Sequence, residues 1–203
     1  MQLNTDKTKE MTIYFGRKPL TFQNVSIEGE PIESVTTCKL LGVLINDKLT
    51  WDEHINYITS KANKRLYFLR MLRRANVNNA HITQVYTSTV RSVLEYAAEV
   101  WHPGTTQKLT RQVEHIQKRF LKIIYPDLSY NKALVAAQLE TLECRREDIC
   151  KTWFSKLCEQ THPLHHLLPP KRNITRLRKA STFTIPTVKT ERLKRSPIFY
   201  GLL

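Results

Sequence analysis

Apolar residues before position 48 come in short runs that Gly and Pro interrupt. Residues 11–15 form one β-prone run, and residues 25–27 form another after the break at Lys18-Pro19. A third run covers residues 40–45 around Gly42. Short apolar runs between turn residues are typical of strands. The pattern therefore predicts a small antiparallel sheet in this part of the chain.

From about residue 50 the spacing of apolar residues changes to three and four, which is the period of a helix. Thr50 followed by Glu53 matches a capping box, in which each residue bonds the backbone of the other. The pattern predicts a helix over residues 51–74. Its apolar stripe consists of Trp51, Ile55, Ile58, Ala62, Leu66, Leu69 and Leu72.

The same period predicts further helices at residues 79–101, 106–124, 130–139 and 144–160. Their short connections favour antiparallel neighbours in a bundle. Residues 162–203 contain five prolines, and residues 171–195 carry nine Lys and Arg against one acid. We expect an α+β fold that is mainly α: a small antiparallel β region at 1–48, a helical domain at 49–161 and an extended basic tail at 162–203.

The net charge of +14 and the pI near 9.8 indicate a polyanionic partner, most often nucleic acid. The alternative is a basic domain with no such partner. The chain has no run of 18 apolar residues and no apolar signal core at its N-terminus, so we expect neither membrane insertion nor secretion. The four cysteines are then reduced thiols of a nuclear or cytoplasmic protein.

The helix at 51–74 is the main candidate for contact with phosphates, because its bases have no acid beside them. The residues expected to bind on this helix are Lys61, Lys64, Arg65, Arg70, Arg73 and Arg74. Weaker extensions are Lys118, Arg119 and Lys122 on the third helix and Arg145 and Arg146 at the start of the fifth. Backbone contacts carry little sequence information, so DNA, RNA and their hybrid remain open as partners. Three tryptophans could stack on bases, although core packing is the favoured interpretation for Trp51 and Trp101.

No catalytic or metal-binding set is visible in the sequence. Nucleotidyl transfer needs carboxylates around two divalent cations, and the chain has no Asp-Asp pair. Cys150 and Cys158 are eight residues apart, and no Cys or His pair has the spacing of a structural zinc site. We therefore expect no cofactor, no metal and no enzymatic activity.

Six short motifs nevertheless follow one another in a specific order. They are Asn4-Thr5-Asp6-Lys7-Thr8-Lys9, Lys39-Leu40-Leu41-Gly42-Val43, Leu49-Thr50-Trp51-Asp52-Glu53-His54-Ile55, Leu94-Glu95-Tyr96-Ala97, Val100-Trp101-His102-Pro103 and Ile116-Gln117-Lys118-Arg119. In this order the chain resembles the C-terminal part of reverse transcriptases from LINE-type (non-LTR) retrotransposons. The resemblance implies that residues 39–43 form a primer-grip hairpin and that the helices from Trp51 form a thumb. It also implies that Lys7 lies near a triphosphate, and that catalysis would need a separate palm and fingers polypeptide.

A second resemblance covers residues 38–80. This segment is similar to segments classed as the N-terminal domain of an AlkB-type alkylated-DNA-repair homologue, and we interpret it as a local match inside retrotransposon sequence. An AlkB-type dioxygenase holds Fe(II) through a His-x-Asp pair and a distant His, and no His here is followed two residues later by Asp or Glu. Three alternatives to a nucleic-acid-binding thumb stay open. One is an enzyme, either a polymerase that works with a separate palm or an Fe(II)/2-oxoglutarate oxygenase. The others are a protein like that N-terminal domain and a truncated product without function.

Overall fold

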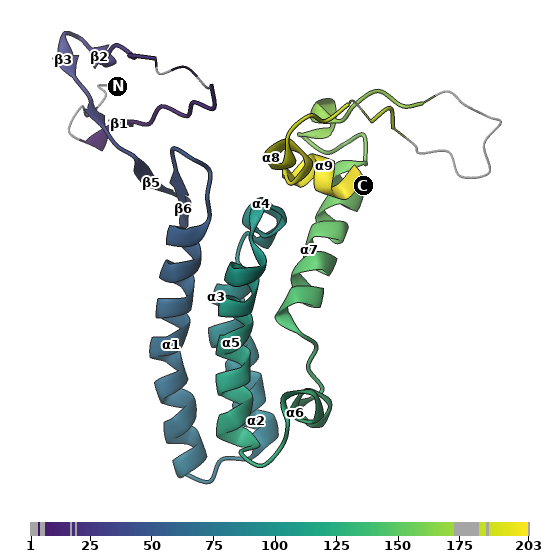
Figure 1. Ribbon diagram of the computed structural model, residues 1–203. Helices are drawn as coiled ribbons and strands as arrows, with labels where there is room; N and C mark the ends of the chain where they lie inside the picture. Colours follow the sequence, from purple (N-terminus) through teal and green to yellow (C-terminus); the bar gives the residue numbers. More distant parts are fainter. Residues whose placement is uncertain are drawn as a thin grey trace. The chain divides into compact units, whose positions relative to one another are not determined.

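The computed structural model describes residue 4 and residues 7–16, 18, 20–172, 183–185 and 187–202. More than half of the chain is helical and the strands are short, so the predicted α+β, mainly α, class is confirmed. The residues form two compact units, 1–57 and 58–203, and the boundary lies inside the first helix (Figure 1). Each unit is described below by itself. The division into 1–48, 49–161 and 162–203 stays a prediction.

The first unit contains three separate two-stranded ladders. β1 (Lys9–Glu10) pairs in parallel with β4 (Glu33–Ser34), and β2 (Ser26–Ile27) pairs antiparallel with β3 (Glu30–Pro31). Two ladders are antiparallel as expected, but the prediction of a single sheet is wrong. The run at 11–15 is not a strand, because the pairing of β1 ends at Glu10 and no ladder continues beyond it.

The third ladder is a tight hairpin. β5 (Thr37–Leu40) pairs antiparallel with β6 (Val43–Asn46), and only Leu41 and Gly42 connect them. Both turn residues have positive φ, 47° and 90°. Positive φ at both positions is the geometry of a type I′ turn, whose twist matches that of the strands. A hairpin at residues 39–43 is therefore present, whereas its contact with a primer stays a prediction.

Helix α1 (Asp52–Arg74) confirms the prediction for residues 51–74. Its capping box is not formed as predicted: the Thr50 N–H donates to Asn46 Oδ1 at 2.8 Å, and Glu53 accepts from the Thr37 hydroxyl at 2.7 Å. Leu44 N–H donates to His54 Nδ1 at 3.3 Å. Because β5 and β6 supply these partners, the side chains at the start of α1 hold the hairpin instead of closing on themselves.

The predicted second helix, 79–101, is interrupted. It consists of α2 (Asn79–Val85), a π-helical segment (Tyr86–Arg91, η2), α3 (Ser92–Glu95) and α4 (Ala98–Trp101). Ala97 has a left-handed φ of 50°, which separates α3 from α4. The indole N–H of Trp101 donates to Tyr96 O at 2.9 Å and so satisfies a carbonyl at the break. A hydrophobic period alone cannot show this break, because the apolar spacing continues through it.

The remaining helices of the bundle agree closely with the predictions. They are the 3-10 turn η3 (His102–Gly104), α5 (Gln107–Ile124), α6 (Tyr130–Ala137) and α7 (Leu142–Leu157). The core includes Leu66, Ile82, Leu94 and Phe120, all fully buried. No helix among the described residues is both long and apolar enough to cross a membrane.

A buried polar network joins the helices around Gln117. This fully buried side chain accepts from the Tyr86 hydroxyl at 2.9 Å and donates to Glu140 O at 2.7 Å and to the Tyr130 hydroxyl at 3.3 Å. The ring of Tyr86 also stacks on Phe120, with centroids 3.9 Å apart. The network fixes the π-helical segment, α5 and α6 in one arrangement, since a buried polar group that lost its partner would be costly.

The tail is not extended throughout its described part. It contains η4 (His165–Leu167), α8 (Glu191–Lys194) and α9 (Pro197–Leu202), and α9 packs on α7 and α4. Gly201 lies directly against the ring of Phe154. Residues 197–202 are mostly apolar, and α9 buries part of this apolar surface by packing on α7 and α4. Three predicted basic residues, Arg176, Arg178 and Lys179, lie outside the described residues.

Candidate nucleic-acid interface

Helix α5 carries an exposed row of basic residues, which we call the α5 stripe. Its members are Lys108, Arg111, His115, Lys118 and Lys122, and all five are exposed. Steps of three and four residues place side chains on one face of a helix. The only acid of α5, Glu114, is turned away from this face: it accepts hydrogen bonds from the Tyr130 hydroxyl and from Leu142 N–H. The α5 stripe therefore contains no acidic side chain.

The six predicted bases of α1 do not lie on one face. Lys61, Lys64, Arg70, Arg73 and Arg74 are exposed, while Arg65 is half-buried. Arg65 donates to Thr89 O in the π-helical segment, and Arg73 donates to Asn79 Oδ1 at 3.2 Å. The reason is geometric, because 3.6 residues per turn spread six nearby positions around the helix. As a consequence, the side chains of Arg65 and Arg73 donate hydrogen bonds inside the second unit.

Three of the predicted bases of α1 are exposed and have no side-chain partner among the described residues. Lys64, Arg70 and Arg74 are exposed, and none of their side chains makes a hydrogen bond or an ion pair with the residues that the structure describes. Exposed bases without acidic partners keep their charge available for an outside anion. These three residues form the part of α1 that best suits the predicted role.

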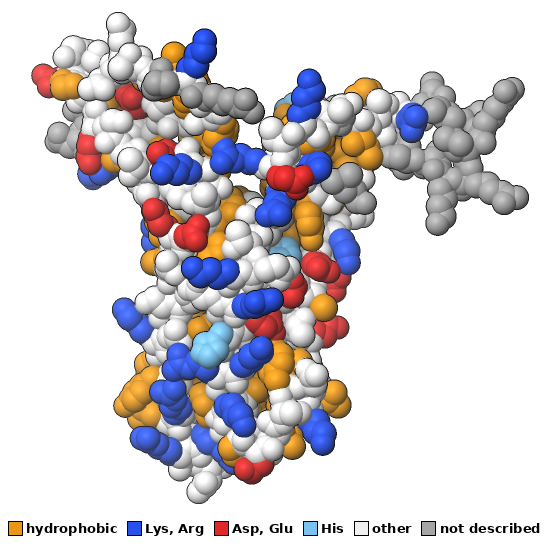
Figure 2. Space-filling model, in the orientation of Figure 1, with side chains coloured by type: hydrophobic (Ala, Val, Ile, Leu, Met, Phe, Trp, Pro, Cys, Tyr) orange, Lys and Arg blue, Asp and Glu red, His pale blue; other side chains and the backbone are white. Residues whose placement is uncertain are grey.

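Within the second unit, α1 and α5 lie side by side. Arg119 donates to Asn63 Oδ1 at 2.6 Å, and Gln112 Nε2 donates to the Thr59 hydroxyl at 3.4 Å. Arg119, predicted as a phosphate contact, is thus half-buried between the two helices. Figure 2 shows Lys and Arg side chains gathered with few acids over the lower half of this view, where α1, α2, α5 and α6 lie in Figure 1. The bases of neighbouring helices thereby form a broader basic surface.

The other two predicted bases of α5 belong to the α5 stripe. Lys118 Nζ lies 5.0 Å from the centre of the Tyr130 ring, and Lys122 Nζ donates to Pro126 O at 2.6 Å. Both side chains stay exposed and can reach an anion as well. Lys108 and Arg111 were not predicted as site residues. The signal was present in the sequence, since both continue the three- and four-residue spacing toward the start of the helix.

Lys7 lies in the first unit, apart from these helices in the chain. It is exposed, and its backbone N–H donates to Asn4 Oδ1 at 3.2 Å. The Thr8 hydroxyl donates to Asn4 O at 2.8 Å. The motif around Asn4 therefore forms a local turn.

Arg145 and Arg146, the weaker predicted phosphate contacts, both have partners inside the second unit. Arg145 makes a bidentate ion pair with Glu95, with N–O distances of 2.6 and 3.2 Å. This pairing raises the pKa of Arg145. Arg146 is fully buried, donates to His102 Nδ1 at 3.3 Å and lies over the Trp101 ring. Burial lowers the pKa of Arg146, while Glu114 opposes that shift. The helical period contained a signal for this, because Arg146 is four residues from both Leu142 and Cys150, which are buried on the inward face of α7.

The described residues contain no group of three His, Cys, Asp or Glu side chains that could hold a metal ion. Burial raises the pKa of the Cys150 thiol to about 12, so this thiol stays protonated and is a poor nucleophile. Trp51 and Trp101 are buried, in line with the core interpretation, and Trp153 is half-buried beside an open hollow of α4 and α7.

The comparisons with known proteins give one local similarity. A family described as "Alkylated DNA repair protein alkB homolog 8, N-terminal" matches residues 51–92, which contain α1, α2 and the π-helical segment. This range overlaps the predicted similarity at 38–80. No curated protein matches the chain, and no solved structure does. The resemblance to reverse transcriptases finds no support in these comparisons and stays a prediction.

Proposed function

We infer that this chain is a non-catalytic module that binds nucleic acid through backbone phosphates. The observation that carries the proposal is the α5 stripe, whose helix has a single acid, and that acid is turned inward. Lys64, Arg70 and Arg74 on the adjacent α1 extend the basic surface. Phosphates bound here release condensed counterions, which is the main source of affinity for such surfaces. DNA, RNA and hybrid are all suitable partners, because phosphate contacts do not read bases.

The decisive experiment compares two double variants that remove the same charge. Lys108→Ala/Arg111→Ala removes one Lys and one Arg from the α5 stripe, and Lys156→Ala/Arg172→Ala removes one of each elsewhere. All four side chains are exposed, so neither variant disturbs the core. Affinity for a duplex is measured by fluorescence anisotropy over a range of salt concentrations. The stripe variant should lower the slope of log affinity against log salt by roughly 1.8, at about 0.9 per lost phosphate contact.

The control variant should keep the slope of the wild-type protein. If both variants reduce the slope equally, only bulk charge matters and the α5 stripe is not the site. If the wild-type protein shows no salt-dependent binding, the proposed function is wrong and the truncated product without function is favoured.

The resemblance to a reverse-transcriptase thumb gives a finer form of this proposal. In that form the module holds a template–primer hybrid beside a separate palm and fingers polypeptide, inside the nucleus or cytoplasm. The isolated chain should then extend no primer with Mg²⁺ or Mn²⁺, since the sequence lacks the carboxylate pair that binds two metal ions. Primer extension by the purified protein that persists after an active contaminant is excluded would overturn this.

The match at residues 51–92 favours a second candidate. The chain would then be a module like the N-terminal part of an alkylated DNA repair protein, without the ligand set of an Fe(II) dioxygenase. The thumb and the repair-like module are expected to prefer different nucleic acids. Tighter binding to an RNA–DNA hybrid than to a DNA duplex of the same sequence would favour the thumb, and the opposite order would favour the repair-like module.

A further inference from the structure

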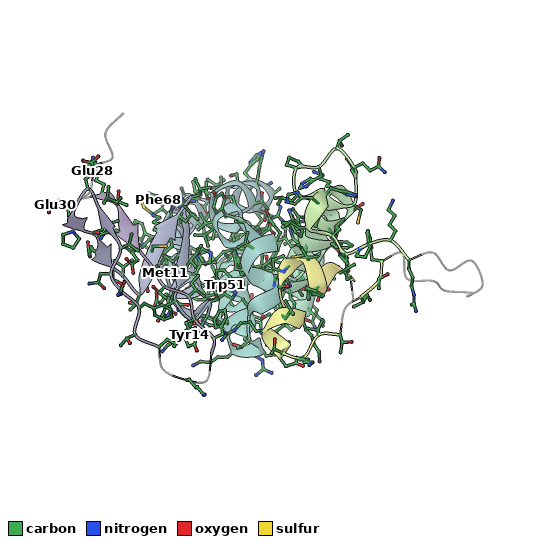
Figure 3. The ribbon with its side chains drawn as sticks, turned by 90° about the horizontal axis from the view of Figure 1, so that it is seen from above. Met11, Tyr14, Glu28, Glu30, Trp51 and Phe68 are labelled. Carbon is green, nitrogen blue, oxygen red and sulfur yellow. The ribbon has the colours of Figure 1, made fainter. Side chains whose placement is uncertain are left out.

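Helix α1 carries an exposed apolar group in the middle of its basic residues. Tyr67, Phe68 and Met71 are 56%, 63% and 48% exposed, and we call them the α1 platform. The neighbouring Leu66 and Leu69 are fully buried and supply the packing of this part of the helix. The α1 platform therefore lies on the opposite, outward side, and Figure 3, seen from above, labels Phe68 at the periphery of the helices.

Basic residues flank the α1 platform along the helix. Lys64, Tyr67, Met71 and Arg74 follow one another in steps of three, four and three residues, so they form one row. Arg70 is exposed within the same stretch, and no acid occurs between Lys64 and Arg74. The row is about 15 Å long at 1.5 Å per residue, the span of roughly four stacked nucleotides at 3.4 Å each.

We propose that the α1 platform binds unpaired bases of a single-stranded nucleic acid, with Tyr67 and Phe68 as stacking surfaces and Lys64 and Arg74 on the flanking phosphates. Aromatic side chains inside a basic groove are the usual means of holding single strands. The two rings meet edge to face, with centroids 6.0 Å apart, so the pair occupies one face of one ring and leaves the other ring faces for stacking. This inference rests on the proposed function and adds that the strand must offer bases as well as phosphates.

The charges around the α1 platform oppose a second copy of this chain as the occupant. Two such faces would bring Lys64, Arg70 and Arg74 against their own counterparts, and like charges facing one another oppose association. A strand of nucleic acid complements both parts of the surface, since its phosphates pair with the bases and its flat rings cover the aromatic side chains.

The test uses three fluorescent ligands of equal length: a 12-nucleotide oligothymidine, an abasic strand and a 12-base-pair duplex. The wild-type protein should bind oligothymidine about tenfold or more tightly than the abasic strand for each stacked base. Tyr67→Ala/Phe68→Ala should remove that difference while leaving the affinity for duplex and the salt slope unchanged. Tyr96→Ala, which removes one exposed aromatic side chain between α3 and α4, should not change the preference for oligothymidine over the abasic strand.

Tyr67→Leu/Phe68→Leu separates stacking from general apolar contact. The leucines keep apolar surface but present no flat ring, so this variant should bind oligothymidine as weakly as the alanine variant. Wild-type affinity in the leucine variant would overturn the proposal, and so would equal affinity of the wild-type protein for oligothymidine and the abasic strand. The latter result, with salt-dependent duplex binding intact, refutes the α1 platform and leaves the proposed function standing.

Two other occupants are excluded in the same series. Cosedimentation with phosphatidylserine vesicles and sedimentation velocity of the free protein should be unaffected by Tyr67→Ala/Phe68→Ala. Loss of vesicle binding or of self-association in this variant, without loss of oligothymidine binding, would overturn the proposal in favour of a membrane or of a second copy.

Discussion

His102 and Arg146 form an unusual contact in the interior of the second unit. The Arg146 guanidinium donates to His102 Nδ1, and the ring of Tyr200 meets His102 edge to face with centroids 6.2 Å apart. Burial and the charge of Arg146 lower the pKa of His102 to about 4. The imidazole is therefore neutral in the folded protein, which lets it accept the hydrogen bond.

This contact predicts a loss of stability in mild acid. The unfolded His102 binds a proton below pH 6.5, whereas the folded His102 does so only near pH 4, so the free energy of unfolding should fall between these values. The expected loss is at most about 3 kcal/mol. Urea unfolding from pH 7.5 to 4.5 measures it. His102→Asn should flatten the dependence, because the Asn oxygen can accept from Arg146 and does not titrate.

Part of the pH dependence should remain in this variant. His54 is fully buried, and burial lowers its pKa as well. A pH profile of His102→Asn that is identical to that of the wild-type protein would contradict the assignment of the effect to His102.

At the scale of single elements, the β5–β6 hairpin combines a favourable and an unfavourable turn residue. Gly42 accepts its φ of 90° without cost, because it has no Cβ. Leu41 adopts a φ of 47°, where a branched side chain costs about 1–2 kcal/mol, and it is 84% exposed. An exposed apolar side chain in a strained turn position contributes little to the stability of the hairpin.

Leu41→Asn should stabilise the hairpin by about 1 kcal/mol, since Asn-Gly is the preferred pair for a type I′ turn. Hydrogen exchange of the Val43 and Ile45 amides measures the change. Leu41→Ala is the control: it removes the same side chain but keeps the strained backbone of a residue with Cβ, so it should give little or no gain. Equal protection in both variants would show that the turn geometry is not the cause.

At the scale of the second unit, the end of the chain belongs to the helical bundle. α9 packs on α7, and a Cβ built on Gly201 would lie 2.2 Å from Phe154 Cδ2. This contact leaves no room for a side chain at 201. Removal of the whole tail would therefore expose part of the bundle as well as removing basic charge, and a binding defect in such a truncation would have two causes.

Gly201→Val should displace α9 and destabilise the second unit by about 1–3 kcal/mol, the usual cost of overpacking. Thermal unfolding measures the loss, and limited proteolysis after residue 187 should become faster. Gly201→Val/Phe154→Ala is the compensating variant, because it makes room for the new side chain and should recover part of the loss. No change in either measurement would mean that α9 does not pack on α7 in solution.

The candidate interface was only partly predictable. Lys64, Arg70 and Arg74 were identified by charge and remain exposed, whereas Arg65, Arg73 and Arg119 turned out to bond neighbouring helices. Charge along one helix does not tell which bases a neighbouring element will use. The α5 stripe could have been found from spacing, but its freedom from acid depends on Glu114, whose partners lie on α6 and α7.

The sequence by itself determined the mainly helical α+β class, the extents of α1 and α5 and the basic character, because periodicity and composition act locally. Only the tertiary structure decided the rest. It separated the strands into three ladders, broke the second helix at Ala97, buried Arg146 and returned α9 to α7. The burial of Arg146 and the return of α9 depend on partners distant in the chain, and such partners are set by packing and hydrogen bonding that no local pattern records.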